Sequence, residues 1–167
     1  MATAYANSIR AALLNALQTD LPPMLSALGL DPIATWESKR VGDPSSAETP
    51  AVVLRFAGWR QPYDDEHASD AGVYTQSTSI YRFLVFVFAS GPDEERIDEE
   101  LAAYAEAVRA VLDDVNNCDL GGVVEDMHPD EAVTSPAISM SGDERYFRAV
   151  QIPVRIWKTR TVGTYSS

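Results

Sequence analysis

One helix is predicted near the N-terminus. Apolar residues recur there at spacings of three and four, which is typical of one face of a helix, over residues 4–20. The members of this stripe are Ile9, Leu13, Leu14, Leu17 and Leu21. Pro22-Pro23 is expected to end the helix, because proline disfavours helical conformation in the residue before it. Residues 24–30 then predict an apolar turn or a short second helix that stops at Gly29, Asp31 and Pro32.

The strongest strand signal lies between Ser77 and Ala89. One face of this strand carries Ile80, Arg82, Leu84, Phe86 and Phe88, and the other carries Tyr81, Phe83, Val85 and Val87. Both faces are mainly apolar, so we expect both to be covered. Thirteen residues at about 3.3 Å each would reach roughly 40 Å, which is long for a strand.

A second amphipathic helix follows this strand. Ser90 to Asp93 predicts its start, with Ser90 placed as in a capping box, and Asn116-Asn117 and Gly121-Gly122 predict its end. The apolar stripe consists of Ile97, Leu101, Tyr104, Val108, Val111, Leu112 and Val115. Asp113 and Asp114 lie where the helix dipole disfavours negative charge, and a cationic neighbour, for example from another chain, would offset this cost.

Weaker signals complete the pattern. Strands are predicted at residues 33–41, Val52–Phe56, Val123–Met127 and Tyr146–Lys158. Polar loops are predicted at 60–74 and 128–143. In the last strand, Val150, Ile152, Val154 and Ile156 share one face. Pro153 cannot donate a ladder hydrogen bond, so this strand is expected at an edge or with a bulge.

The order of elements predicts a single α+β domain over residues 1–167, with loose ends at 1–3 and 159–167. We expect a mostly antiparallel sheet of four to five strands with two main helices on one face. The long strand is expected to pair with Val52–Phe56 in a projecting hairpin tipped by the acidic loop 60–74.

Composition narrows the possible partners. The formal net charge is −12, and phosphate binding needs clustered Lys and Arg, so nucleic-acid wrapping is disfavoured. An acidic wall could still surround DNA without holding it. The single cysteine, Cys118, excludes an intrachain disulfide and favours folding in a reducing compartment. Neither a membrane span nor a signal peptide is expected.

The sequence contains no recognisable catalytic motif, so no enzymatic activity, metal or cofactor is predicted. His67 and His128 lie in predicted loops, where half of a metal site completed by Asp64, Asp65 or Asp70 is possible but a solvated side chain is favoured. Cys118 beside Asp119 is read as structural, because nearby negative charge raises the pKa of a thiol. The acids of 93–100 are read as a solvated helix face.

The basic residues near the C-terminal end of the chain divide between the two faces of the predicted last strand. Because side chains alternate along a strand, Arg148, Lys158 and Arg160 share one face, and Arg145 and Arg155 share the other. This division disfavours a single phosphate groove, and ion pairs with acidic loops, across strands or subunits, are favoured instead.

The second apolar face of the long strand predicts that the protein assembles with another chain. Two helices on one side of the sheet leave the other side of Ser77–Ala89 for another chain, although the first strand and the loops could cover it within the monomer. The sequence does not decide whether the odd-numbered or the even-numbered residues of this strand face the helices. The predicted interface residues are Tyr81, Phe83, Val85, Phe86, Val87, Arg155 and Trp157.

The chain resembles the tail terminator and tail completion proteins of long-tailed bacteriophages. The matching features are the run Ser77–Phe88, the helix Asp93–Leu112, the strand start at Gly121 and the run Arg148–Ile156. The resemblance implies a virion protein that folds in the host cytoplasm and forms a ring, expected to be a hexamer. The ring would cap the tail tube and join it to the head and neck, with the tube protein and neck proteins as partners.

Other readings stay open, namely another neck protein of related fold, a small ligand-binding or regulatory domain, and an enzyme whose site is built across subunits. In a ring, DNA would pass without tight binding. The predicted lumen acids are Asp64, Asp65, Glu66 and Asp70, with Asp126, Asp130 and Glu131.

Overall fold

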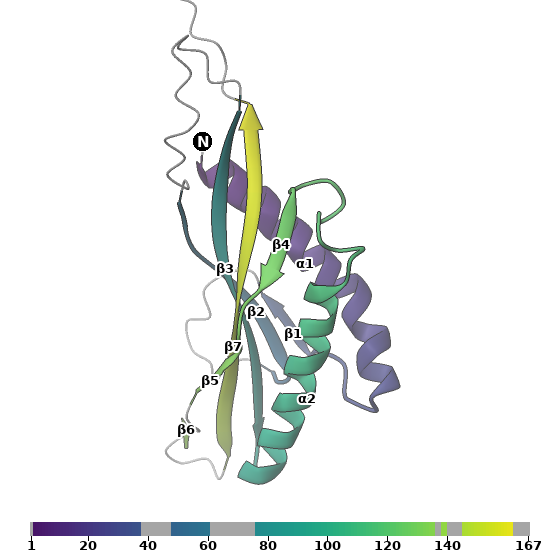
Figure 1. The fold of residues 1–167 in the computed structure, drawn as a ribbon. Helices are drawn as coiled ribbons and strands as arrows, with labels where there is room; N and C mark the ends of the chain where they lie inside the picture. The colour runs from purple at the N-terminus through teal and green to yellow at the C-terminus, as the bar shows by residue number, and fades with distance from the viewer. Residues whose placement is uncertain (1, 38–47, 61–75, 136–137, 140–144, 162–167) are drawn as a thin grey trace, which may run out of the picture.

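A computed structural model describes residues 2–37, 48–60, 76–135, 138–139 and 145–161. Within these residues two helices and seven strands follow one another along the chain (Figure 1). Their bounds are α1 Ala2–Ala27, β1 Thr35–Glu37, β2 Ala51–Arg60, β3 Gln76–Gly91, α2 Glu94–Asp113, β4 Asp126–Pro129, β5 Val133–Thr134, β6 Ile138–Ser139 and β7 Tyr146–Thr161. The predicted loop 60–74 lies outside the described residues apart from Arg60. Of the ends predicted as loose, residues 2–3 belong to α1 and residues 159–161 to β7, and 162–167 lie outside the described residues.

The strands form one sheet in the order β1-β2-β3-β7-β4, and β5 and β6 also pair with β7. All pairings are antiparallel except β1 with β2. The predicted class, α+β with a mostly antiparallel sheet and two helices on one face, is confirmed. The strand number was too low, because the segment 128–143, predicted as a loop, contributes β5 and β6. The strand predicted at Val123–Met127 forms at Asp126–Pro129 instead.

The longest pairing joins β3 to β7 rather than β3 to β2. Sixteen residues of each strand are in register, from Gln76 opposite Thr161 to Gly91 opposite Tyr146. β2 pairs with β3 only from Ala51 opposite Phe88 to Arg60 opposite Ile80. The upper ends of β3 and β7 therefore extend together beyond β4 and α2 (Figure 1). The predicted hairpin with β2 is present, but β7 supplies the longer partner.

Helix α1 continues through Pro22-Pro23, so its predicted end at the prolines was wrong. Each proline removes one backbone donor, but Leu21 and Leu25 on either side are buried and extend the apolar stripe. Burial of one such side chain contributes about 1.5–3 kcal/mol, which offsets the loss. The helix ends before Gly29, whose φ of 68° suits glycine, and the Leu30 N–H donates to the Leu25 carbonyl.

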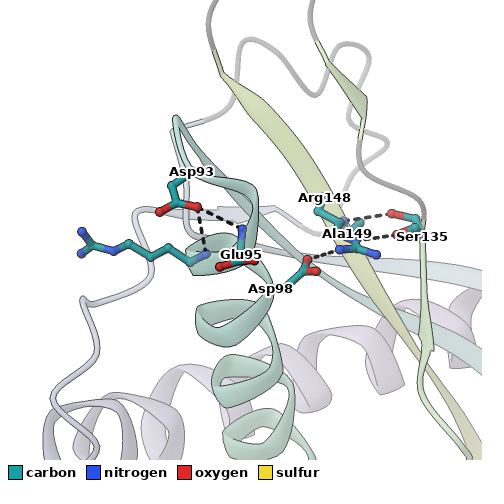
Figure 2. A network of polar contacts seen from close by, with 7 residues as sticks. Asp93, Glu95, Asp98, Ser135, Arg148 and Ala149 are labelled. Carbon is teal, nitrogen blue, oxygen red and sulfur yellow. Dashed lines mark hydrogen bonds and ion pairs between the residues drawn. The ribbon is translucent and has the colours of Figure 1, made fainter.

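Helix α2 begins and ends inside its predicted bounds. The Asp93 side chain accepts hydrogen bonds from the N–H groups of Glu95 and Arg96, so Asp93 is the N-cap and Ser90, predicted as the cap, belongs to β3 (Figure 2). The helix stops at Asp113, and Val115, assigned to its apolar stripe, is 78% exposed. The cation near this acidic end comes from the same chain: Arg109 lies 3.3 Å from Asp113.

Strand β7 lies inside the sheet, between β3 and β4, and the edge position predicted from Pro153 was wrong. In an antiparallel strand the N–H and C=O of a residue point to the same side. The Pro153 carbonyl accepts from the Asp130 N–H, so the missing N–H also faces Asp130. That residue lies just past the end of β4 and before β5. The proline therefore occupies a gap in the ladder.

The core lies between the sheet and the helices. Alternate residues of β3 and β7 that point toward α1 and α2 are buried, together with the apolar stripes of both helices. The larger side chains that β3 and β7 contribute to this layer are Tyr81, Phe83, Val85, Val87, Val150, Ile152, Val154 and Ile156. The predicted shared face of β7 is thus confirmed as the core face.

Candidate interface on the open face of the sheet

The face of the sheet that points away from α1 and α2, here called the open face, carries no helix within the described residues (Figure 1). Because side chains alternate along a strand, Ile80, Arg82, Leu84, Phe86 and Phe88 of β3 all point to it. Arg82 is exposed, and the four apolar residues are half-buried. An apolar row of this length that stays partly exposed is typical of a contact surface.

Aromatic side chains form the lower part of the open face. The rings of Phe86 and Phe88 stack at 5.9 Å between centroids, and Phe88 lies 5.4 Å from Phe147 of β7. Val53 of β2 is opposite Phe86 and is 5% exposed. Ring pairs of this kind add about 0.5–1.5 kcal/mol beyond burial of their area. This part of the face is therefore apolar and packed.

The upper part is polar and is built on Arg155. Its guanidinium contacts both carboxylate oxygens of Asp130, the shortest distance being 2.7 Å, and lies 5.5 Å from the Trp157 ring centroid. The Arg109 guanidinium of α2 also donates to the Asp130 carbonyl. His128 meets the edge of Trp157 and lies 2.9 Å from Asp126. These contacts fix the side chains along the β4–β7 border.

A pocket of about 510 Å³ opens in this upper part. It exists because β2 bulges between Phe56 and Gly58, so that Gly58 stands opposite Arg82 and places no side chain there. Gly58 has a φ of 122°, which L-residues rarely adopt. The lining residues are Ala57, Gly58, Trp59, Arg60, Ile80, Arg82, Asp130 and Arg155.

Four of the seven predicted interface residues are core residues of the monomer. Tyr81, Phe83, Val85 and Val87 point toward α2 and α1 and are at most 3% exposed, so no other chain can reach their side chains. The odd-numbered residues of β3 therefore face the helices, which the sequence had not decided. Phe86, Arg155 and Trp157 lie on the open face, and their role in an interface stays a prediction.

The predicted lumen acids fall into two groups. Asp64, Asp65, Glu66 and Asp70 lie outside the described residues. In the second group, Asp126 and Asp130 are paired with His128 and Arg155 of the same chain, while Glu131 is exposed.

The late basic residues divide between the two faces as their parity predicts. Arg148 points to the helix side, where it pairs with Asp98 of α2 and donates to the Ser135 carbonyl (Figure 2). Lys158 donates to the Val123 carbonyl, whereas Arg155 lies on the open face. Arg145 lies 3.5 Å from the Ser90 hydroxyl, and the side chain of Arg160 is outside the description. The contacts of Arg148 and Arg155 with acids are intrachain ion pairs.

His128 is the one predicted metal-ligand candidate that lies within the described residues. His67 lies outside the described residues, and His128 belongs to β4 rather than to a loop. Cys118 is half-buried and free. Among the described residues, no three acidic, histidine or cysteine side chains gather as a metal site would require, and neither helix is long and apolar enough to cross a membrane.

The pocket arginines Arg60 and Arg82 were missed by sequence reasoning. Arg82 was seen only as one residue of an apolar strand, and Arg60 as the first residue of a loop. The available signal was Gly58 inside a strand pattern, which often marks a bulge.

Comparison with known proteins finds similarity among solved structures only. No protein family model matches the chain, and no curated protein matches it. Among solved structures, a chain from "Virion of native gene transfer agent (GTA) particle" is similar, with 13% identity and a TM-score of 0.49. The match covers 92% of this chain and 98% of that one.

Proposed function

We propose that the protein is a structural virion component of the tail terminator kind, and that copies of it form a ring at the end of a phage-type tail tube. The observation that carries the proposal is the open face of the sheet, with its partly exposed apolar row on β3 and no helix over it in the described residues. A second copy of the chain is the partner that would cover this row. The resemblance in element order and strand pattern supplies the rest of the proposal.

In such a ring the chain has no enzymatic role and works through its surfaces. It would stop growth of the tube and contact the tube protein on one side and neck proteins on the other. Another neck component of the same assembly class would use the same open face.

The first experiment measures the solution mass of the purified chain by light scattering over a wide range of concentration. The expected mass is six times the 18.2 kDa of one chain. A ring of another size would revise only the number of copies. A monomer at every concentration would overturn the proposal.

A second experiment concerns DNA. Six chains would carry a formal charge of about −72, from −12 each, and screening confines each charge to about 8 Å at physiological salt. We propose that Glu131 and the acids of 64–70 line the passage, since Asp126 and Asp130 have partners in the chain. A gel-shift with duplex DNA at about 50 mM salt should show no complex. Tight binding that weakens steeply with salt would place basic residues in the lumen.

A small ligand-binding role has one observation in its favour, which is the pocket itself. Its volume of about 510 Å³ lies within the range of ligand pockets. It opens on the sheet surface rather than between helix and sheet. A monomeric chain whose melting temperature rises with a small anion would favour this role over the ring.

A further inference from the structure

The pocket on the open face holds an excess of positive charge. Arg82 of β3 and Arg155 of β7 stand directly opposite each other, and Arg60 completes the rim. Like charges directly opposite on neighbouring strands are destabilising. Asp130 neutralises Arg155, but within the described residues no carboxylate pairs with Arg60 or Arg82. In a chain with a net charge of −12, this site is built to receive an anion.

The matching anionic surface is the first two turns of α2. Residues 93–100 contain six carboxylates and one arginine. Asp98 is paired with Arg148, and Glu100 is paired with Arg96. Among the described residues no cation pairs with the exposed side chains of Glu94, Glu95 and Glu99. They form a carboxylate surface that projects from one end of the molecule.

One chain cannot bring these two surfaces together. Arg82 and Gly91, the last residue before the turn into α2, are nine residues apart on β3, which is about 30 Å. The pocket also lies on the open face, whereas α2 covers the other face (Figure 1). Different surfaces at opposite ends of a molecule make a head-to-tail contact between copies, and such contacts form a ring when the rotation between neighbouring copies closes.

We propose that the pocket of Arg60, Arg82 and Arg155 binds the acidic first turns of α2 from a second copy of the chain. The inference rests on the proposed ring and names the surfaces that hold neighbouring copies together. Charge complementarity of this kind fixes the register of an interface and selects the partner.

Charge-reversed variants of the two surfaces test this docking. The pocket variant carries Arg60→Glu and Arg82→Glu together, so that both pocket arginines without a carboxylate partner become acidic, and Arg82→Glu is also tested alone. The helix variant carries Glu94→Arg, Glu95→Arg and Glu99→Arg together, so that its exposed carboxylates become basic. Each replaces exposed side chains, so circular dichroism should show folded protein. Because juxtaposed like charges cost several kcal/mol, the concentration for half-assembly should rise more than about tenfold for each variant alone.

Mixing the two variants is the decisive measurement. In an equimolar mixture, acidic pockets meet basic helices and basic pockets meet acidic helices, so alternating rings should form again. Arg96→Glu is the comparison variant, because it makes the same change of charge as Arg82→Glu but inside the acidic surface of α2. The added negative charge faces the basic pocket, so this variant should assemble at least as well as the wild type. If Arg96→Glu weakens assembly as much as Arg82→Glu, or if the mixture fails to assemble, the docking is overturned.

Three further outcomes separate this inference from the proposed function. If the wild type assembles and Arg82→Glu assembles equally well, the docking is wrong and the ring stands. If Arg82→Glu keeps the ring but abolishes binding of duplex DNA by the wild type, the pocket contacts phosphates instead. If the wild type itself is monomeric, both proposals fail.

Discussion

The two faces of the sheet differ in what their side chains contact. On the helix-covered face, Phe83, Val85 and Val87 of β3 are fully buried, whereas Leu84, Phe86 and Phe88 on the open face remain half-exposed. Both sets are apolar, so hydrophobicity does not distinguish them. The difference lies in the two helices, which pack on one face only. Substitutions on the covered face should therefore change folding, and substitutions on the open face should change assembly.

The largest effect is expected from Phe83→Asp. This side chain is inaccessible to solvent and packs against Phe56, with ring centroids 5.3 Å apart. A buried, unpaired carboxylate costs more than about 4 kcal/mol, which is a large part of the stability of one domain. Circular dichroism and thermal melting should show an unfolded chain. A folded variant with a normal melting curve would contradict the assignment of faces.

Leu17→Ala should have the next largest effect on stability. Leu17 is fully buried on the apolar stripe of α1, and large-to-small changes at such sites cost about 2–5 kcal/mol. Urea denaturation would measure the loss. The matched control is Leu28→Ala just beyond the helix, where Leu28 is 58% exposed, and a change within about 0.5 kcal/mol is expected there. Equal losses at the two positions would mean that α1 does not pack on the sheet.

Phe86→Asp should destabilise the monomer by only about 1–2 kcal/mol, since the side chain is half-exposed and loses mainly its stacking with Phe88. The chain should fold and fail to assemble, as light scattering would show. Phe86→Leu keeps an apolar surface and is the control for assembly. If Phe86→Asp unfolds the chain as Phe83→Asp does, the open face is not an interface.

The smallest effect concerns Tyr104 on the helix layer. Its hydroxyl donates to the Asp31 carbonyl, and burial, with a smaller contribution from Asp31 and Glu100, raises the pKa of Tyr104 to about 12. An unfolded tyrosine ionises near pH 10, so its contribution to stability is complete below pH 10 and is lost as the pH rises toward 12.

Tyr104→Phe tests this point. At pH 8 the free energy of unfolding of the variant should be about 1 kcal/mol lower than that of the wild type, because the hydrogen bond is missing. Between pH 10 and 12 the free energy of unfolding should fall less in the variant than in the wild type. Urea denaturation at both pH values would measure it, with Tyr5→Phe as a control for the substitution itself. Parallel alkaline losses in Tyr104→Phe and the wild type would show that other groups dominate.

The errors of the sequence reading share a physical cause. The prolines of α1 act locally, but Leu21 and Leu25 gain their burial from the sheet and keep the segment helical. Pro153 is tolerated in an interior strand because β4 ends beside it. In both cases a local rule was overridden by contacts with residues far away in the sequence. The pocket was harder to predict from the sequence, because Gly58, Arg82 and Arg155 lie on three different strands and come together only in the folded sheet.

By itself the sequence determined the class of fold, the two helices, the long strand and the burial of Val150, Ile152, Val154 and Ile156. These follow from periodicity, because a side chain's direction along one element depends only on the backbone repeat. Only the tertiary structure decided which face of β3 the helices cover, which strand pairs with its full length, and which charges meet. Two apolar faces of one strand are equivalent until something packs on one of them.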